Sequence, residues 1–163
     1  MNFLKLFAVI FLSIVITRFI PHPPNFTSLV ALSFYIPAVF GIIYIPFVLI
    51  SFVITDVLIG FHNFLFFTWG STVIIGLFSR LFISSDLKLR LTGATAGAVL
   101  FFIITNFGVW ITGSYEYTIK GIIDCYTMAI PFFGYTLIST LMFSIIIEII
   151  IKIKKTKSVY QEY

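Results

Sequence analysis

Long apolar stretches, separated by short polar connections, run along the whole chain. The first stretch covers residues 3–19 and ends at the proline-rich segment 20–24, where prolines remove backbone donors and prevent the helix from continuing. The second covers residues 26–59, which as one helix would be about 50 Å long and exceed a single membrane crossing. Pro37, Gly41 and Pro46 lie near its middle, so the pattern predicts two short spans there.

A transmembrane helix needs about 20 apolar residues. On that basis we predict an all-α membrane protein with six transmembrane helices, forming a single transmembrane domain over residues 1–163. The residues after the last helix form a basic cytoplasmic tail, 152–163. The predicted spans are residues 3–19, 28–43, 44–59, 64–83, 91–110 and 128–151.

The positions of Lys and Arg predict the orientation, because short cytoplasmic loops are enriched in these residues. With the N and C termini cytoplasmic, only Arg18 and Lys120 lie on the outer side. A five-span arrangement with the N terminus outside gives the same charge balance, and the helix lengths favour six. Residues 1–20 also resemble a signal peptide, but Arg18 and Pro21 occupy the place of a cleavage site. The cytoplasmic residues are Lys5, Arg80, Lys88, Arg90, Lys152, Lys154, Lys155 and Lys157.

Composition supports this assignment. The chain is 60% hydrophobic and only 10% charged, which is too little charge to cover the surface of a soluble domain. A soluble enzyme, a nucleic-acid-binding domain and a disulfide-rich secreted protein are therefore excluded. The net charge of +4 follows from orientation and does not call for a nucleic-acid partner.

Polar side chains are concentrated on the predicted outer side. Such groups are costly within a bilayer unless they are paired or functional, so we expect them to form an outward-facing pocket for a small molecule. In this pocket Arg18 would meet an anionic group, Asn25 and Asn106 would orient polar edges, and two aromatic residues would stack on the ligand. The candidate ligand-binding residues are Arg18, His22, Asn25, Asp56, His62, Asn106, Trp110, Asp124 and Tyr126.

Several of these residues also have a structural interpretation. Arg18 can form an ion pair with Asp56 or with Asp124 that locks helices together. Trp110 suits the aromatic belt at the membrane surface, whereas the amide of Asn106 needs a partner if it is buried. Both interpretations remain open at this point.

The connection at residues 111–127 is predicted to be a long outer loop. Its glycines and tyrosines suit a cap that closes over a ligand. Cys125 within it is more typical of a small buried thiol than of a nucleophile. Its neighbours match no zinc or copper spacing, so we predict no metal and no cofactor. No catalytic or nucleotide-binding motif occurs in the chain, so we predict that it is not an enzyme.

Small residues open the fifth predicted span. Gly93 and Gly97, with Ala94 and Ala98 beside them, form a face that allows another helix to approach closely. Packing within the protein is the favoured interpretation, and contact with a partner protein is the alternative.

Four motifs resemble an uncharacterised family of small bacterial integral membrane proteins, named only as a domain of unknown function. The resemblance extends over approximately residues 18–141 and implies a multi-pass protein of the bacterial cytoplasmic (inner) membrane. The motifs are the segments 20–26, 106–110 and 125–133, and the combination of Asp56, Gly60 and His62.

The layout is more loosely similar to the S components of energy-coupling-factor (ECF) transporters. Those proteins have six helices, both termini inside, and a ligand pocket under the outer loops. This similarity implies an S-component-like bundle, a small-molecule ligand at the outer face, and transmembrane and ATPase partner subunits. The leading hypothesis is therefore small-molecule binding and uptake. The alternatives are a structural or assembly subunit of a membrane complex and, less favoured, a membrane-embedded enzyme.

Overall fold

The computed structural model describes residues 3–82 and 86–161, with side chains up to Ile153 in the last helix. Over these residues the protein contains six α-helices and no strand. The helices are α1 (Phe3–Phe19), α2 (Leu29–Phe40), α3 (Ile45–Ile59), α4 (Leu65–Phe78), α5 (Leu87–Val109) and α6 (Ile119–Gln161). The all-α prediction and the expected number of helices are confirmed for the described part of the chain.

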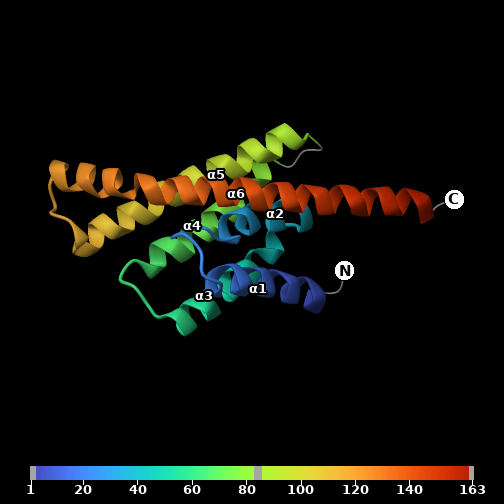
Figure 1. Cartoon of the computed structure of the whole chain (residues 1–163), viewed down its shortest axis with the longest axis horizontal. Helices are drawn as coiled ribbons and strands as arrows, with labels where there is room; N and C mark the ends of the chain where they lie inside the picture. Colours follow the sequence, from blue (N-terminus) through green and yellow to red (C-terminus); the bar gives the residue numbers. More distant parts are fainter. Residues whose placement is uncertain (1–2, 83–85, 162–163) are drawn as a thin grey trace.

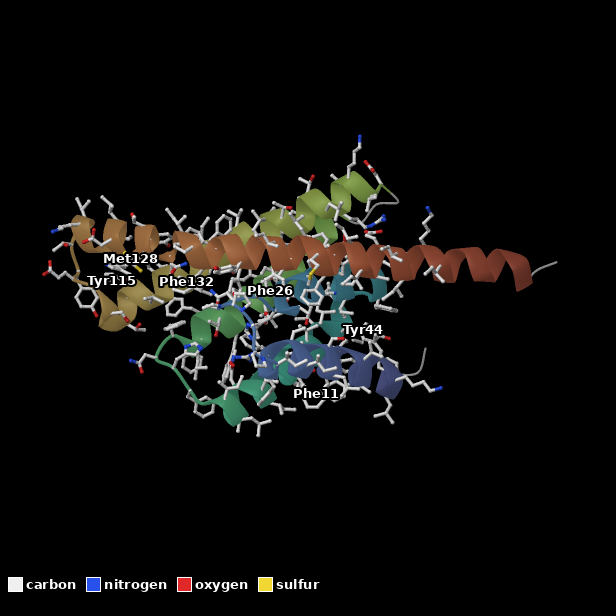
Figure 2. All side chains as sticks on the ribbon, in the orientation of Figure 1. Phe11, Phe26, Tyr44, Tyr115, Met128 and Phe132 are labelled. Atoms are coloured by element: carbon white, nitrogen blue, oxygen red, sulfur yellow. The ribbon has the colours of Figure 1, made fainter. Side chains whose placement is uncertain are left out.

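Within the described part of the chain, four helical segments are long and apolar enough to cross a membrane: Ile42–Ile59, Leu65–Phe82, Leu87–Ser114 and Ile119–Ile153. Aliphatic and aromatic side chains project from the helices over the outside of the bundle (Figure 2), with Phe66 80% and Leu4 77% exposed. A surface of this kind suits lipid rather than water. These features indicate a membrane protein.

The helices run back and forth along one axis, so that α1 begins and α6 ends at the same end of the bundle (Figure 1). Helix α1 packs against α3, and α5 packs along α6. The α5–α6 hairpin projects beyond the other helices at the opposite end (Figure 1). That opposite end carries the connections 20–28, 60–64 and 115–118.

Helix α2 forms the centre of the bundle. It contacts α3, α4, α5 and α6, and every side chain from Leu29 to Pro37 is buried. A helix that is hydrophobic on all sides is expected to be buried on all sides. It ends at Gly41, whose φ of 104° is readily adopted only by glycine, and the short 3₁₀ turn Ile42–Tyr44 leads into α3. The predicted break within residues 26–59 is confirmed.

The small-residue face of α5 packs inside the protein. Ala94 and Ala98 are fully buried, and a Cβ atom on Gly93 would come 2.5 Å from the ring of Phe34. Gly97 faces Ile75 in the same way, at 3.2 Å. Internal packing, the favoured interpretation, is therefore confirmed.

The predicted long loop at residues 111–127 is wrong. Helix α5 leads into the π turn Trp110–Ser114, which is kinked at Gly113 (φ 87°), and α6 already begins at Ile119, so the true connection is residues 115–118. Thr118 starts the new helix by accepting a hydrogen bond from the backbone N–H of Gly121 at 3.0 Å, as N-cap residues do. Most of the residues expected to form a cap are helical. The first turns of α6 include Asp124, Cys125 and Tyr126. Helix α6 also extends to Gln161, so residues 152–161 of the basic segment are a helical continuation.

Candidate functional site

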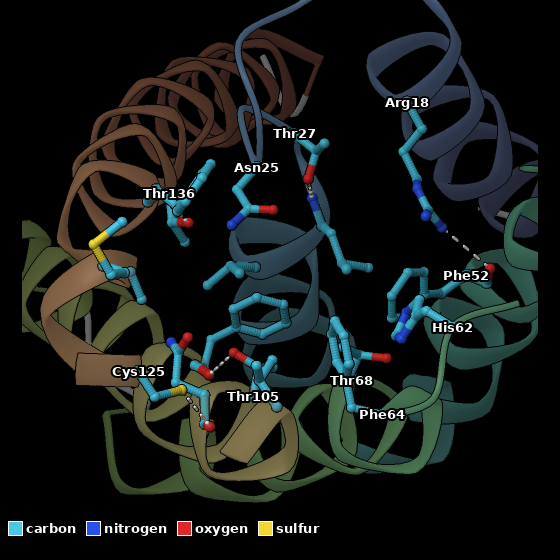
Figure 3. Close-up of a pocket in the computed structure, with 18 of the residues that line it drawn as sticks. Arg18, Asn25, Thr27, Phe52, His62, Phe64, Thr68, Thr105, Cys125 and Thr136 are labelled. Atoms are coloured by element: carbon cyan, nitrogen blue, oxygen red, sulfur yellow. Dashed lines mark hydrogen bonds between the residues drawn. The ribbon is translucent and has the colours of Figure 1, made fainter. Parts of the chain in front are cut away.

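A cavity of about 630 Å³ lies between the helices at the end that carries the three connections. All six helices contribute to its wall, together with the connections 20–28, 60–64 and 115–118. Figure 3 shows Asn25, Arg18 and His62 reaching it from different elements, with Thr68 and Thr105 on a further wall. The polar lining residues are Arg18, His22, Asn25, Thr27, His62, Thr68, Thr105, Asn106, Tyr115, Cys125 and Thr136.

Of the nine candidate residues, the structure brings together Arg18, His22, Asn25, His62 and Asn106 in the lining of this cavity. The others, Asp56, Trp110, Asp124 and Tyr126, are not part of the lining. Several lining residues were not among the candidates, most clearly the threonines. Four of these, Thr27, Thr68, Thr105 and Thr136, come from four different elements. The only sequence signal for them is a threonine near the outer end of an apolar span.

Arg18 is held in place by an ion pair. Its Nη2 lies 2.6 Å from Oδ1 of Asp56, and its Nη1 donates to Oγ1 of Thr55 at 2.5 Å. The guanidinium carbon lies 4.7 Å from the centre of the Phe52 ring, within the range of a cation–π contact. The prediction that Arg18 pairs with an acidic residue is confirmed, and the partner is Asp56.

Asp56 is buried to 1% exposure and uses both carboxylate oxygens. While Oδ1 binds Arg18, Oδ2 accepts a hydrogen bond of 2.6 Å from Nε1 of Trp69. Asp56 and Trp69 lie at similar distances on either side of the 60–64 connection, on α3 and α4. Their similar distances from this connection are a pattern in the sequence that could have suggested the contact, and it was not recognised. Asp56 therefore lies outside the cavity lining and holds the Arg18 side chain in position.

The proline-rich connection folds back over α1. Ser28 donates its backbone N–H to the Thr17 hydroxyl at 3.2 Å, and the two hydroxyl oxygens are 3.0 Å apart. Asn25 adopts a positive φ of 63°, which asparagine tolerates better than most residues. This turn directs the Asn25 amide into the cavity (Figure 3). Nδ1 of His22 lies 2.7 Å from the carbonyl oxygen of Pro23, which fixes the imidazole ring.

His62 is a lining residue with unused hydrogen-bonding capacity. Its Nδ1 is buried and has no hydrogen-bond partner in the structure, and its ring packs on Phe64 with centroids 4.0 Å apart. Burial lowers the pKa of His62 below its usual 6.5, although the nearby Asp56 carboxylate opposes this shift; Arg18 adds to the lowering. A neutral imidazole in a cavity wall can donate or accept a hydrogen bond from a ligand.

The α5–α6 side of the cavity is held by backbone contacts. Nδ2 of Asn106 donates to the Phe102 carbonyl at 2.7 Å, which gives the amide the partner it was expected to need. Cys125, 2% exposed, lies 3.4 Å from the Asn106 carbonyl through its sulfur. Cys125 therefore lines the cavity as a small, buried thiol.

The candidates outside the lining have other contacts. Nε1 of Trp110 donates to the Glu116 carbonyl at 3.0 Å, and the Tyr126 hydroxyl donates to the Ile103 carbonyl at 2.7 Å. These bonds tie the α5–α6 connection and the two helices together. Asp124 is exposed on α6. Among the described residues, no group of three or more His, Cys, Asp or Glu side chains could hold a metal ion.

Comparison with known proteins gives a family but no activity. Over residues 1–161 the chain matches a family of unknown function, DUF6580. The chain belongs to this family. The match extends over all six helices, and so includes every residue of the cavity wall. Neither the curated proteins nor the solved structures give a match.

Proposed function

We propose that this DUF6580 protein binds a small molecule at the outer face of a membrane and serves its uptake. The observation that carries this proposal is the cavity of about 630 Å³ with the unpartnered, buried Nδ1 of His62 in its wall. Ligand pockets typically enclose about 300–1,000 Å³ and combine an apolar lining with a few convergent polar groups. The cavity has both properties.

The lining also limits the chemistry of the ligand. Arg18 is the one charged side chain among the described lining residues, and Asp56 neutralises it. The remaining polar groups are amides, hydroxyls and imidazoles, interleaved with the rings of Phe52, Phe64 and Phe132. Such a wall suits a molecule without a large net charge that has an apolar body and a few hydrogen-bonding atoms. His62 and Asn25 would meet those atoms.

We further propose six membrane crossings with both termini in the cytoplasm. The cavity lies at the end opposite to the start of α1, so this orientation opens it to the outside. Lys88, Lys152 and the basic segment after it then lie on the cytoplasmic side, which agrees with the distribution of positive charge in membrane proteins. The cytoplasmic membrane of a bacterium is the proposed location.

Native mass spectrometry of the protein, gently extracted from its own membrane, tests the binding role. We expect a retained small molecule that is lost in the Asn25→Ala and His62→Phe variants and kept in Asp124→Asn, whose side chain is exposed and outside the lining. Co-purified ATPase and transmembrane subunits would add the predicted partners. A retained mass that none of the cavity variants changes would contradict the proposal.

An assembly subunit is the second candidate, and the saturated Asp56 carboxylate favours it. A carboxylate that binds both Arg18 and Trp69 joins α1, α3 and α4 and needs no ligand. This function predicts that the protein co-purifies with a fixed set of membrane proteins and that Asn25→Ala and His62→Phe leave that set unchanged.

A further inference from the structure

A row of polar side chains on the inner face of α6 starts at the cavity and leads toward the other end of the bundle. Thr136, Thr140, Ser144 and Glu148 follow one another at intervals of four residues, which places them on one face of a helix. Thr136 is 4% exposed, and Thr140 and Ser144 are completely buried. Thr136 is also part of the cavity wall. The row therefore starts at the cavity and extends about 18 Å toward the other end of the bundle, where α6 continues (Figure 1).

An ion pair ends the row. Nε and Nη2 of Arg90 donate to the two carboxylate oxygens of Glu148, each at 2.6 Å. The two side chains are only 13% and 11% exposed. The other titratable or charged groups around the pair are the Tyr35 hydroxyl of α2, Asp86 at the start of α5, and Lys152 one turn further along α6. Ionisable side chains within membrane-spanning helices are rare; they pair with one another, and many of them mark ion or proton pathways.

The hydroxyls between the cavity and the ion pair make few hydrogen bonds within the protein. Thr140 Oγ1 and Ser144 Oγ are buried and donate to no backbone carbonyl, and the buried Tyr35 hydroxyl lies within reach of the Ser144 and Glu148 side chains. Buried Ser and Thr in helices normally donate to a carbonyl of the preceding turn. Other buried hydroxyls of this protein do so: Ser33, Ser71, Thr105 and Ser139 are examples. The hydroxyls of Tyr35, Thr140 and Ser144 thus form one cluster in the interior.

Buried polar groups without protein partners are usually satisfied by ordered water. Residues four apart on a helix are separated by about 6 Å along its axis, and two hydrogen bonds of about 2.8 Å through one tetrahedral water span about 4.6 Å, so one or two waters bridge successive side chains of the row. Such waters between Thr140 and Ser144 would complete both hydroxyls. Toward the cavity they would reach Thr136, whose hydroxyl donates to the Phe132 carbonyl at 3.0 Å and whose oxygen can still accept a hydrogen bond from water. Tyr35 supplies a further contact beside Ser144.

We propose that this row, together with Tyr35, binds a chain of water molecules that carries protons between the outer cavity and Glu148. In each transfer, Glu148 accepts one proton from the adjacent water, which regains one from the next water toward the cavity; the ion pair with Arg90 is released, while Arg90 stays protonated. Glu148 then returns the proton to water at the other end of the bundle. One proton crosses, and no other bond changes. The use of this path to drive uptake rests on the proposed function, whereas the path itself does not.

Radiolytic hydroxyl labelling in water enriched with ¹⁸O tests the water chain without any knowledge of the ligand. This method labels buried side chains only where water lies beside them. Tyr35 and Phe34 are neighbours of the same helix, 1% and 0% exposed, so Phe34 is a matched dry control. We expect labelling of Tyr35 several times stronger than that of Phe34, and loss of the excess in the Thr140→Val/Ser144→Ala double variant. Equal labelling of the two rings in the wild-type protein would overturn the proposal.

Infrared spectroscopy of the protein in lipid vesicles tests the proton step. On acidification we expect the C=O band of a protonated carboxyl group that is absent in Glu148→Gln. Its appearance after a pH step should be markedly slower in Thr140→Val/Ser144→Ala, and unchanged in Ser139→Ala, whose hydroxyl already donates to the Thr136 carbonyl. A wild-type spectrum identical to that of Glu148→Gln would overturn the proton role. Neither measurement depends on the cavity ligand, so a failed binding experiment leaves this inference intact.

Discussion

Arg18 and Asp56 form an ion pair of 2.6 Å between the end of α1 and the end of α3, with the carboxylate almost completely buried. Removal of one partner leaves a buried charge without compensation, whereas removal of both leaves an apolar contact.

We therefore expect Arg18→Leu or Asp56→Leu alone to destabilise the protein by about 3–5 kcal/mol, and the double variant to lose clearly less. Unfolding of the purified protein in mild detergent, followed by tryptophan fluorescence, measures this. If the free energy of unfolding fell in the double variant by the sum of the two single decreases, the two side chains would not be energetically coupled and this interpretation would fail.

The glycine face of α5 gives a second prediction. A Cβ atom at Gly93 would lie 2.5 Å from the Phe34 ring and 2.6 Å from Phe82, so Gly93→Ala should cost about 1–3 kcal/mol through overpacking. At Gly70 in α4 a methyl group would meet no atom within 4 Å, and Gly70→Ala should stabilise its helix by about 0.5–1 kcal/mol. Thermal unfolding of the two variants side by side provides the comparison. Equal changes in melting temperature in the two variants would mean that helix propensity, and not packing against Phe34 and Phe82, determines the effect of the added methyl group.

His62 predicts how stability depends on pH. Because burial lowers its pKa in the folded protein below 6.5, the unfolded chain binds the proton more readily than the folded protein. The stability contributed by neutral His62 is complete above about pH 6.5 and is lost as the pH falls through the lower, folded pKa. Melting temperatures between pH 8 and pH 5 should fall less in His62→Gln than in the wild type. The His22→Gln variant, which retains His62, should keep the wild-type dependence; an unchanged pH profile in His62→Gln would contradict the assignment.

Much of the fold was predictable because membrane burial imposes a simple pattern. Apolar stretches bounded by Pro and Gly indicated the six helices, and the break between α2 and α3 falls at Gly41, close to the boundary predicted between residues 43 and 44. The connection at 111–127 was misjudged for a physical reason. Gly121 suggested a loop, but it lies within α6, where a Cβ atom would collide with the Glu116 carbonyl. Gly121 allows the backbone at Glu116 to pass close to the start of α6. This contact is visible only in the folded structure.

The site was predictable only in part. Arg18, Asn25 and His62 were singled out because polar residues in an apolar chain are conspicuous. Trp69, which binds the second oxygen of Asp56, looked like an ordinary apolar residue. Arg90 and Glu148 are separated by 58 positions, and no local pattern signals a contact between α5 and α6 at that distance. Contacts of this kind depend on how helices pack, which apolar periodicity does not specify.

Cys125 provides a chemical test of the cavity, because it is the single cysteine of the chain and lines the cavity while only 2% exposed. A small methanethiosulfonate reagent should modify it slowly, and a bulky one should not. Ala129→Phe places a ring in the cavity wall one turn along α6 and should slow the reaction further. Tyr126→Phe, outside the lining, should have no such effect. Mass spectrometry of the intact protein follows the reaction, and equal rates in all three proteins would show that the thiol is reached by another route.

The position of Asn25 distinguishes six membrane crossings from five. With five crossings and an external N terminus, residue 25 would lie on the cytoplasmic side, whereas His62 would lie outside. The structure places both side chains in the wall of one cavity, which supports the proposed six crossings, with residues 25 and 62 on the same side. In a Cys125→Ser background, we expect Asn25→Cys and Asn63→Cys to react with a membrane-impermeant maleimide added to intact cells. Lys5→Cys and Lys88→Cys should react only after the membrane is opened. Labelling of Lys5→Cys in intact cells, with Asn25→Cys protected, would instead support five crossings and would separate the first connection from the cavity.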